Sequence, residues 1–176
     1  MAKKKILGIP GSVRTQSINQ AILQNIADLY ADKLDLKICS DLSQLPHFNP
    51  DLGDDNLAES VAKFRQEVSD ADGVIICTPE YVFSPPAILK NALEWTVSTT
   101  VFSEKPVALI VASGLGEKTY ESLTLILHTL GARLPPSSKL LIQGARAKFK
   151  AAGDQQTIEE LKRTMASFIQ SIENLH

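Results

Sequence analysis

The stretch GVIICTPEYVFSPP, residues 73–86, decides the fold, because a fully apolar run leads into a loop of prolines, aromatic residues and an acid. A short continuous apolar run is typical of a central strand in a parallel sheet, since helices cover both faces of such a sheet. Pro86 suits the first turn of a helix, where a missing N–H breaks no hydrogen bond. We therefore expect a buried strand, a rigid loop and a helix in direct succession.

The rest of the chain repeats this alternation of strand and helix. Further strands are predicted over residues 4–9, 35–39, 106–112 and 139–142. Helices are predicted over residues 18–30, 56–69, 86–97, 118–130 and 154–174, the last with Asp154 as its N-cap. Alternating strands and helices imply right-handed βαβ units and a parallel sheet covered by helices on both faces. We expect one flavodoxin-like α/β domain over residues 1–176, a three-layer sandwich whose five strands lie in the order 2-1-3-4-5.

Composition narrows the class of protein. The 176 residues suffice for one domain with a sizeable core, and a formal net charge of −2 gives no sign of a nucleic-acid partner. No apolar run is long enough to span a membrane, and the two cysteines, Cys39 and Cys77, show no CxxC spacing. We expect a cytoplasmic protein without a disulfide framework or a metal site, in which His128, surrounded by apolar residues, is packed.

The topology predicts where a ligand binds. In an open α/β sheet, ligands bind beyond the carboxyl ends of the strands at the point where the strand order reverses. In the expected order this point lies between strands 1 and 3. Three loops reach this region: residues 10–17, 78–86 and 113–117.

The first of these loops carries groups that suit a terminal phosphate. They are the hydroxyls of Ser12, Thr15 and Ser17, the amide of Asn19 and the cation of Arg14. The N-terminus of the following helix adds free N–H groups and the positive end of a dipole. The spacing matches neither GxGxxG nor a Walker A loop, and neither cysteine is followed by the arginine of a phosphatase loop, which favours binding without cleavage. The alternative is that Ser17 caps the helix in a capping box with Gln20, while Arg14 is solvated.

Two stretches resemble the NADPH-dependent FMN reductase family. GSVRTQSIN, residues 11–19, is similar to its G-S-x-R-x-x-S-x-N loop, and PEYVFSPPAILKNALEW, residues 79–95, resembles its P-E-Y-N-x-S-x-P-x-x-L-K-N-x-x-D-W stretch. SQLPHFNPDL, residues 43–52, is similar to the leucine–proline loop of that family. The resemblance covers residues 4–131, with Glu94 in place of the usual aspartate.

The resemblance implies an oxidoreductase that binds FMN and uses NADPH or NADH as co-substrate. Its acceptors would be quinones, azo dyes, chromate or free flavins. The implied cofactor-binding residues are Ser12, Arg14, Ser17, Ile18 and Asn19 in the first loop, Pro79, Glu80, Tyr81, Val82 and Phe83 in the second, and Ser113 and Gly114 in the third. Val82 replaces the usual asparagine and Phe83 replaces a small residue, which changes the face where a substrate stacks.

The second loop also suits a flavin on physical grounds. A flavin ring needs a flat slot with backbone N–H donors and apolar cover. A proline-braced loop supplies rigid donors, and Tyr81 and Phe83 supply cover; the alternative is that both aromatic residues plug the end of the sheet or an interface. For Glu80, an ion pair with Lys90 is expected ahead of a role as a functional acid. In the third loop, Gly114 allows close backbone approach to the ligand, the alternative being a flexible turn.

Two of the predicted helices, residues 86–97 and 118–130, carry more apolar residues than one buried face needs. We expect both helices to form the interface of a homodimer or homotetramer, as the resemblance also implies. The alternative is burial under the loop of residues 98–105.

The predicted activity is hydride transfer from nicotinamide to flavin N5 and on to the acceptor by a ping-pong mechanism. No side chain is nominated as catalytic, because the flavin carries the bond chemistry. Two other functions remain open: a flavin-binding electron carrier or redox sensor without turnover, and an interaction protein that has lost FMN.

Overall fold

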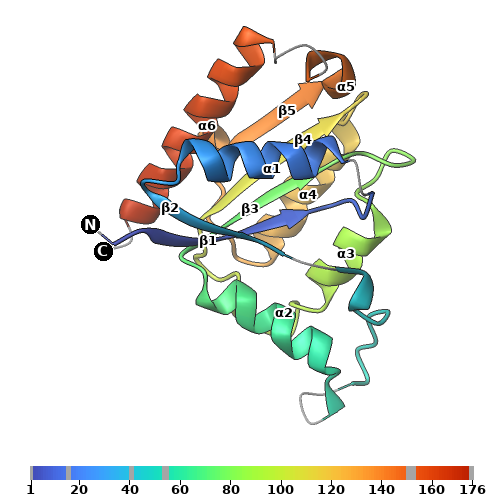
Figure 1. Ribbon diagram of the computed structural model, residues 1–176. Helices are drawn as coiled ribbons and strands as arrows, with labels where there is room; N and C mark the ends of the chain where they lie inside the picture. The colour runs from blue at the N-terminus through green and yellow to red at the C-terminus, as the bar shows by residue number, and fades with distance from the viewer. Residues whose placement is uncertain (1, 15–16, 40–41, 53–55, 150–153, 175–176) are drawn as a thin grey trace.

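The computed structural model describes residues 2–14, 17–39, 42–52, 56–149 and 154–174 (Figure 1). Its strands are β1 (Lys4–Pro10), β2 (Leu34–Ile38), β3 (Gly73–Thr78), β4 (Val107–Ser113) and β5 (Lys139–Gln143). Its helices are α1 (Ile18–Leu29), α2 (Glu59–Asp70), α3 (Ala87–Glu94), α4 (Glu117–Thr129), α5 (Ala145–Lys148) and α6 (Gln155–Glu173), and short 3-10 turns are η1 (Leu42–Gln44) and η3 (Pro136–Ser138). The predicted strands and helices are therefore all present.

The five strands form one parallel sheet in the order β2-β1-β3-β4-β5, which confirms the predicted fold. All six residues of β3 are buried, as its continuous apolar pattern requires of a central strand. The register pairs Pro10 of β1 with Cys77 of β3, and Ser113 of β4 with Gln143 of β5. The loops that follow these four strands therefore start at the same edge of the sheet.

Helices cover both faces of the sheet and make the molecule a three-layer sandwich (Figure 1). On one face, α1, α5 and α6 pack over a core that includes Ile26, Ile75 and Phe168. On the other face, α2, α3 and α4 pack over a core that includes Trp95 and Phe102. Apolar burial on both faces holds the strand ends, and hence the loops after them, in fixed positions.

The leucine–proline loop is held against α3 by side chains that belong to the second quoted stretch. The Pro46 carbonyl accepts hydrogen bonds from Asn91 Nδ2 at 2.9 Å and Trp95 Nε1 at 2.7 Å. Asn91 Oδ1 in turn accepts from the Phe48 N–H at 2.8 Å. The Phe48 and Trp95 rings meet edge to face with centroids 5.2 Å apart. Asn91 and Trp95 are therefore structural residues.

Three local details differ from the sequence-based expectation. Ser17 occupies the N-cap position of α1, but its side chain makes no capping bond, so the capping box with Gln20 is wrong. α3 ends at Glu94 because residues 95–98 form a turn. α5 follows β5 almost directly, where no helix was predicted. By contrast, Asp154 caps α6 as expected, accepting the Thr157 N–H at 3.3 Å.

The carboxylate of Glu80 caps the start of α4. Its Oε1 accepts the Gly116 N–H at 3.1 Å and its Oε2 accepts the Thr119 N–H at 2.8 Å. The expected ion pair with Lys90 is wrong, because Lys90 Nζ instead donates to Glu94 Oε1 at 2.6 Å, one helical turn away. An acid at a helix N-terminus satisfies free N–H groups and interacts favourably with the helix dipole. Glu80 therefore joins the loop after β3 to the helix that follows β4.

The turn after Glu80 is tight and strained. Tyr81 and Ser84 exchange two backbone hydrogen bonds of 3.0 Å, with Val82 and Phe83 as the two central residues. Both central residues have positive φ, 50° and 54°, as in a type I′ turn. Asparagine and glycine favour this backbone, whereas a left-handed conformation costs a bulky residue roughly 1–2 kcal/mol. The turn is therefore a local source of strain.

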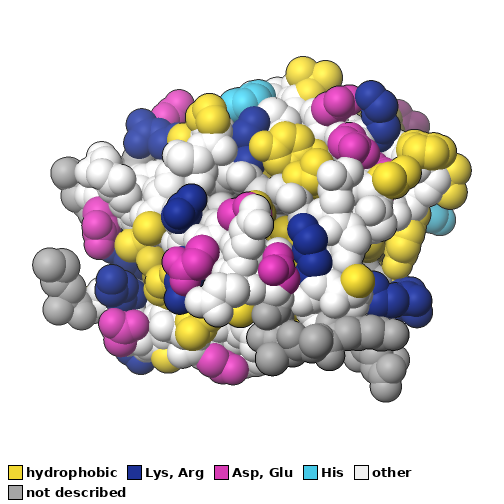
Figure 2. All heavy atoms as spheres, turned by 90° about the horizontal axis from the view of Figure 1, so that it is seen from above, with side chains coloured by type: hydrophobic (Ala, Val, Ile, Leu, Met, Phe, Trp, Pro, Cys, Tyr) yellow, Lys and Arg dark blue, Asp and Glu magenta, His cyan; other side chains and the backbone are white. Residues whose placement is uncertain are grey.

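Charge on the visible face and the length of the described helices bear on the class of partner. On the face shown in Figure 2, positive and negative side chains are interspersed. None of the helices among the described residues is long and apolar enough to cross a membrane.

Replacing Glu80 by alanine is expected to lower the free energy of unfolding by about 2 kcal/mol, because two N–H groups at the start of α4 lose a charged acceptor. The matched control is Glu94→Ala, which removes a partly exposed carboxylate whose pair with Lys90 contributes about 0.5 kcal/mol. Urea denaturation of the three proteins measures both losses. Equal losses for the two variants would show that the Glu80 cap contributes no more to the free energy of unfolding than a surface ion pair does.

The double substitution Val82→Asn and Phe83→Gly is expected to raise the free energy of unfolding by about 1–2 kcal/mol, because both residues then suit the positive φ of the turn. Val97→Asn is the control, since Val97 is also exposed but does not have positive φ. Denaturant unfolding again supplies the measurement. A double variant no more stable than wild type would argue against strain in the turn.

Candidate functional site

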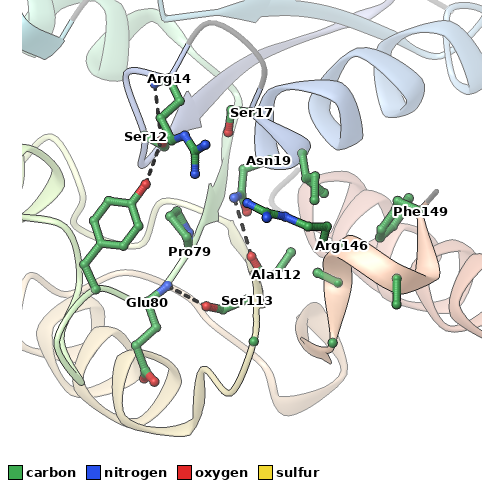
Figure 3. Close-up of a pocket in the computed structure, with 16 residues that line it drawn as sticks. Ser12, Arg14, Ser17, Asn19, Pro79, Glu80, Ala112, Ser113, Arg146 and Phe149 are labelled. Atoms are coloured by element: carbon green, nitrogen blue, oxygen red, sulfur yellow. Dashed lines mark hydrogen bonds between the residues drawn. The ribbon is translucent and has the colours of Figure 1, made fainter.

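A cavity of about 940 Å³ lies at the carboxyl ends of β1, β3, β4 and β5 (Figure 3). This volume is near the top of the range of roughly 300–1,000 Å³ that is typical of small-molecule sites. Ten of the residues predicted to bind the cofactor line it: Ser12, Arg14, Ser17, Ile18, Asn19, Pro79, Glu80, Tyr81, Ser113 and Gly114. The structure thus brings all three predicted loops to one place.

The loop after β1 forms a polar wall of this cavity. Ser12 is buried, and its Oγ lies 3.2 Å from the Tyr81 hydroxyl and accepts the Arg14 N–H at 3.4 Å. Ser17 is only 8% exposed, yet its hydroxyl has no hydrogen-bond partner among the described residues. Figure 3 places the Arg14 side chain beside Ser12 and Ser17. Thr15, also predicted here, falls outside the described residues.

The loops after β1 and β3 approach each other closely below this wall. A Cβ on Gly11 would come within 2.0 Å of Thr78 Oγ1, so only glycine fits at this position. Asn19, at the first turn of α1, donates to the Ala112 carbonyl at 3.5 Å and accepts the Cys77 thiol at 3.4 Å. These contacts tie α1 to β3 and β4 directly under the cavity.

Neither the cysteines nor His128 offers reactive groups to the cavity. Cys39 and Cys77 are both buried, and burial strongly raises the pKa of the Cys77 thiol. A thiol in this state is not a nucleophile, because only the thiolate reacts. His128 is exposed on α4, so the expectation that it is packed is wrong.

The loop after β3 contributes Pro79, Glu80 and Tyr81 to the cavity, whereas Val82 and Phe83 do not line it. Val82 is 94% and Phe83 67% exposed, so their turn projects into solvent next to Tyr81. Tyr81 is itself 43% exposed. The alternative that Tyr81 and Phe83 plug the end of the sheet is therefore wrong, and the cavity is open to a ligand, whereas the alternative that they lie in an interface stays a prediction.

The loop after β4 is fixed by Ser113 and open at Gly114. Ser113 Oγ accepts the Glu80 N–H at 3.1 Å, which adds to the contacts between Glu80 and the start of α4. A Cβ on Gly114 would meet no atom within 4 Å. The backbone at Gly114 is therefore accessible from the cavity.

Sequence reasoning missed the wall formed after β5. Gly144, Ala145, Arg146, Ala147 and Phe149 form this wall, and Ala112 of β4 also lines the cavity. α5 has only four residues, too few for a helical pattern of apolar residues to stand out. The signal that could have found this wall is positional, because the loop after the fifth strand starts at the same edge of the sheet as the other three.

The cavity has positive character. It is lined by two arginines, Arg14 and Arg146, and neither has an acidic partner among the residues that the structure describes. Of the described lining residues only Glu80 is acidic, and both of its oxygens already accept N–H groups of α4. Unpaired guanidinium groups, a buried free hydroxyl and an adjoining helix N-terminus fit a phosphate group. The residues therefore fit a phosphorylated ligand such as FMN.

Comparison with known proteins agrees with this arrangement. The family model for NADPH-dependent FMN reductases matches residues 4–147. The NADH:(hydroxy)cinnamate reductase subunit CrdA of Vibrio ruber is 34% identical over 172 residues, 93% of this chain and 84% of the relative. An NADPH:quinone oxidoreductase of Arabidopsis thaliana is 33% identical over 184 residues, 93% of this chain and 89% of the relative.

A solved structure extends the agreement to the whole fold. The flavoenzyme FerB from Paracoccus denitrificans, an NAD(P)H:(acceptor) oxidoreductase, matches with a TM-score of 0.85 and 26% identity, over 97% of this chain and 98% of that chain. FMN and NAD(P)H are the cofactor and co-substrate that these matches support, as the sequence predicted. The chain is an oxidoreductase with a flavodoxin-like fold, and it belongs to the NADPH-dependent FMN reductase family.

Proposed function

We propose that this protein binds FMN in the 940 Å³ cavity and transfers electrons from NAD(P)H to a quinone or a similar small acceptor. The observation that carries the proposal is that the Arg14 guanidinium and the buried Ser17 hydroxyl lie beside each other, neither with a partner among the described residues. A cation and a free hydroxyl at the first turn of a helix suit a terminal phosphate. The family match supports FMN as the molecule that carries it.

The lining residues have separate tasks in this proposal. Ser12, Arg14, Ser17 and Asn19 hold the phosphate, with Ile18 beside them. Pro79, Glu80 and Tyr81 form the wall for the ring, while Ser113 and Gly114 leave their backbone accessible to it. The turn of Val82 and Phe83 stands at the edge of the site, where its apolar side chains can cover a stacked substrate.

Bound FMN supplies the redox chemistry, which is hydride transfer from the reduced nicotinamide to the acceptor by way of the ring. The chain itself positions the ligands and excludes water; no side chain is required as an acid or a base. Among the described residues there is no glycine-rich loop that would form a separate site for the dinucleotide. We therefore propose that nicotinamide and acceptor use the same place in turn, which is a ping-pong mechanism.

The acceptor class follows the relatives. The NADPH:quinone oxidoreductase of Arabidopsis thaliana and the NAD(P)H:(acceptor) oxidoreductase FerB both match most of this chain. A quinone is flat and apolar, and so suits a slot bordered by Tyr81 and the exposed Phe83. Azo dyes, chromate and free flavins are further acceptors to compare with it.

We also propose a cytoplasmic homodimer or homotetramer that pairs through α3 and α4. Phe102 of the 98–105 loop is buried over this face, so the loop covers part of the apolar surplus. Val97 and Leu125 nevertheless remain 59% and 69% exposed. Exposed apolar residues next to two helices favour an interface there.

The purified protein is expected to show the visible absorption of a bound flavin, or to acquire it with added FMN, and to oxidise NADPH or NADH when a quinone is present. Initial rates at several quinone concentrations should give parallel double-reciprocal lines, as in a ping-pong mechanism. FMN binding without NAD(P)H oxidation would support an electron carrier or sensor. Failure to bind FMN at all would support an interaction protein.

Arg14→Gln is expected to weaken FMN binding roughly 10- to 100-fold, because a charge-assisted contact to phosphate contributes about 1.5–3 kcal/mol. Arg133→Gln is the control, since Arg133 is an arginine outside the cavity that pairs with Glu104. Quenching of flavin fluorescence during titration measures both dissociation constants. Equal affinities for the two variants would remove Arg14 from the phosphate site.

A further inference from the structure

We propose that Arg146 is a second phosphate-binding residue, which contacts the terminal phosphate of FMN from the side opposite Arg14. The proposal rests on the FMN-binding function given above. It assigns a role to α5, the wall of the cavity that the sequence motifs do not include.

Backbone bonds and packing hold Arg146 in place. Gly144 has a φ of 62°, and its N–H donates to the Gly114 carbonyl at 3.1 Å, which ties the start of α5 to the loop after β4. Ala145 is buried in the core beneath α1 and α6, and Phe149 packs against the same core. Arg146 lies between these two anchors, and its side chain lines the cavity.

The Arg146 side chain points toward the first turn of α1. In Figure 3 it extends from α5 to Asn19, while Arg14 approaches the same turn from the other side, next to Ser17. The two arginines thus lie on either side of the first turn of α1, where Ser17 and Asn19 are proposed to hold the phosphate. Such an arrangement suits one anion held between two planar, multidentate cations.

The charge of the cavity matches a phosphate monoester. Arg14 and Arg146 have no acidic partner in the described parts of the chain, and the oxygens of Glu80 are occupied by Gly116 and Thr119. A phosphate monoester carries a charge of about −1.5 to −2 at pH 7 and three acceptor oxygens. Two guanidinium groups can balance that charge, whereas Arg14 alone leaves part of it unbalanced.

The competing ligand for Arg146 is the pyrophosphate of NAD(P)H. The free hydroxyl of Ser17 and the N-terminus of α1 favour the monoester, because they add donors at the place where both arginines point. Riboflavin distinguishes the two possibilities, since it has the ring and ribityl chain of FMN but no phosphate.

Arg146→Gln is expected to raise the Kd for FMN about tenfold or more and to change the Kd for riboflavin less than about twofold. Arg146→Lys should recover part of the loss, and the variant with both Arg14→Gln and Arg146→Gln should bind FMN no better than riboflavin. The control is Lys148→Gln, which removes a cation from the same short helix outside the cavity lining. Fluorescence titration of the full chain, freed of flavin, measures each Kd.

Three results would overturn the proposal. Unchanged FMN affinity with a raised KM for NAD(P)H would assign Arg146 to the dinucleotide. Equal losses for FMN and riboflavin would mean that Arg146 acts through packing. Unchanged values throughout would leave Arg146 without a role in binding.

Inorganic phosphate separates this proposal from the proposed function. If wild type bound no flavin, the proposed function would fail, and thermal melts with inorganic phosphate would still test the anion site. Phosphate should then raise the Tm of wild type and of Lys148→Gln, but much less that of Arg146→Gln. Equal increases in all three proteins would overturn the role of Arg146.

Discussion

The carboxylate of Glu80 holds two walls of the site in one arrangement. Its oxygens accept the N–H groups of Gly116 and Thr119, and its own N–H donates to Ser113 Oγ. Glu80, in the loop after β3, is thus bonded once to the last residue of β4 and twice to the start of α4. Because free N–H groups at a helix start need an acceptor, the cap also stabilises α4 itself. The loop after β3 and the accessible backbone at Gly114 therefore keep a fixed relation.

The opposite part of the cavity carries positive charge that the described residues do not balance. Arg14 and Arg146 face the cavity without acidic partners among the described residues. Two like charges near one helix N-terminus disfavour the free protein slightly, and an anion that binds between them removes this repulsion. Ligand binding to the folded state alone raises stability. We therefore expect stability and phosphate binding to be coupled in this protein.

Most of the fold was predictable, because strands and helices follow from the spacing of apolar residues, and a change of one residue does not alter that spacing. The buried run of β3 and the apolar faces of the helices predict a parallel sheet covered on both faces, and the number of strands and the chain length favour the order that the structure has. The partner of Glu80 was not predictable, because its acceptor groups bind backbone N–H atoms more than 30 residues away, whereas charge pairing suggested Lys90. Arg146 was missed because α5 is too short to have a period. The positive φ of Val82 and Phe83 was not predictable, because valine and phenylalanine rarely adopt it.

In the turn of Val82 and Phe83, the backbone conformation and the side chains follow different patterns. Its positive φ values are those that asparagine and glycine adopt with little strain, and the family pattern has asparagine at the first position. Val82 therefore departs from the pattern in its side chain while the backbone keeps a form suited to asparagine. The two hydrogen bonds between Tyr81 and Ser84, followed by Pro85 and Pro86, hold this form against the strain. The turn thus keeps this backbone form, and the substitution adds exposed apolar surface beside the cavity.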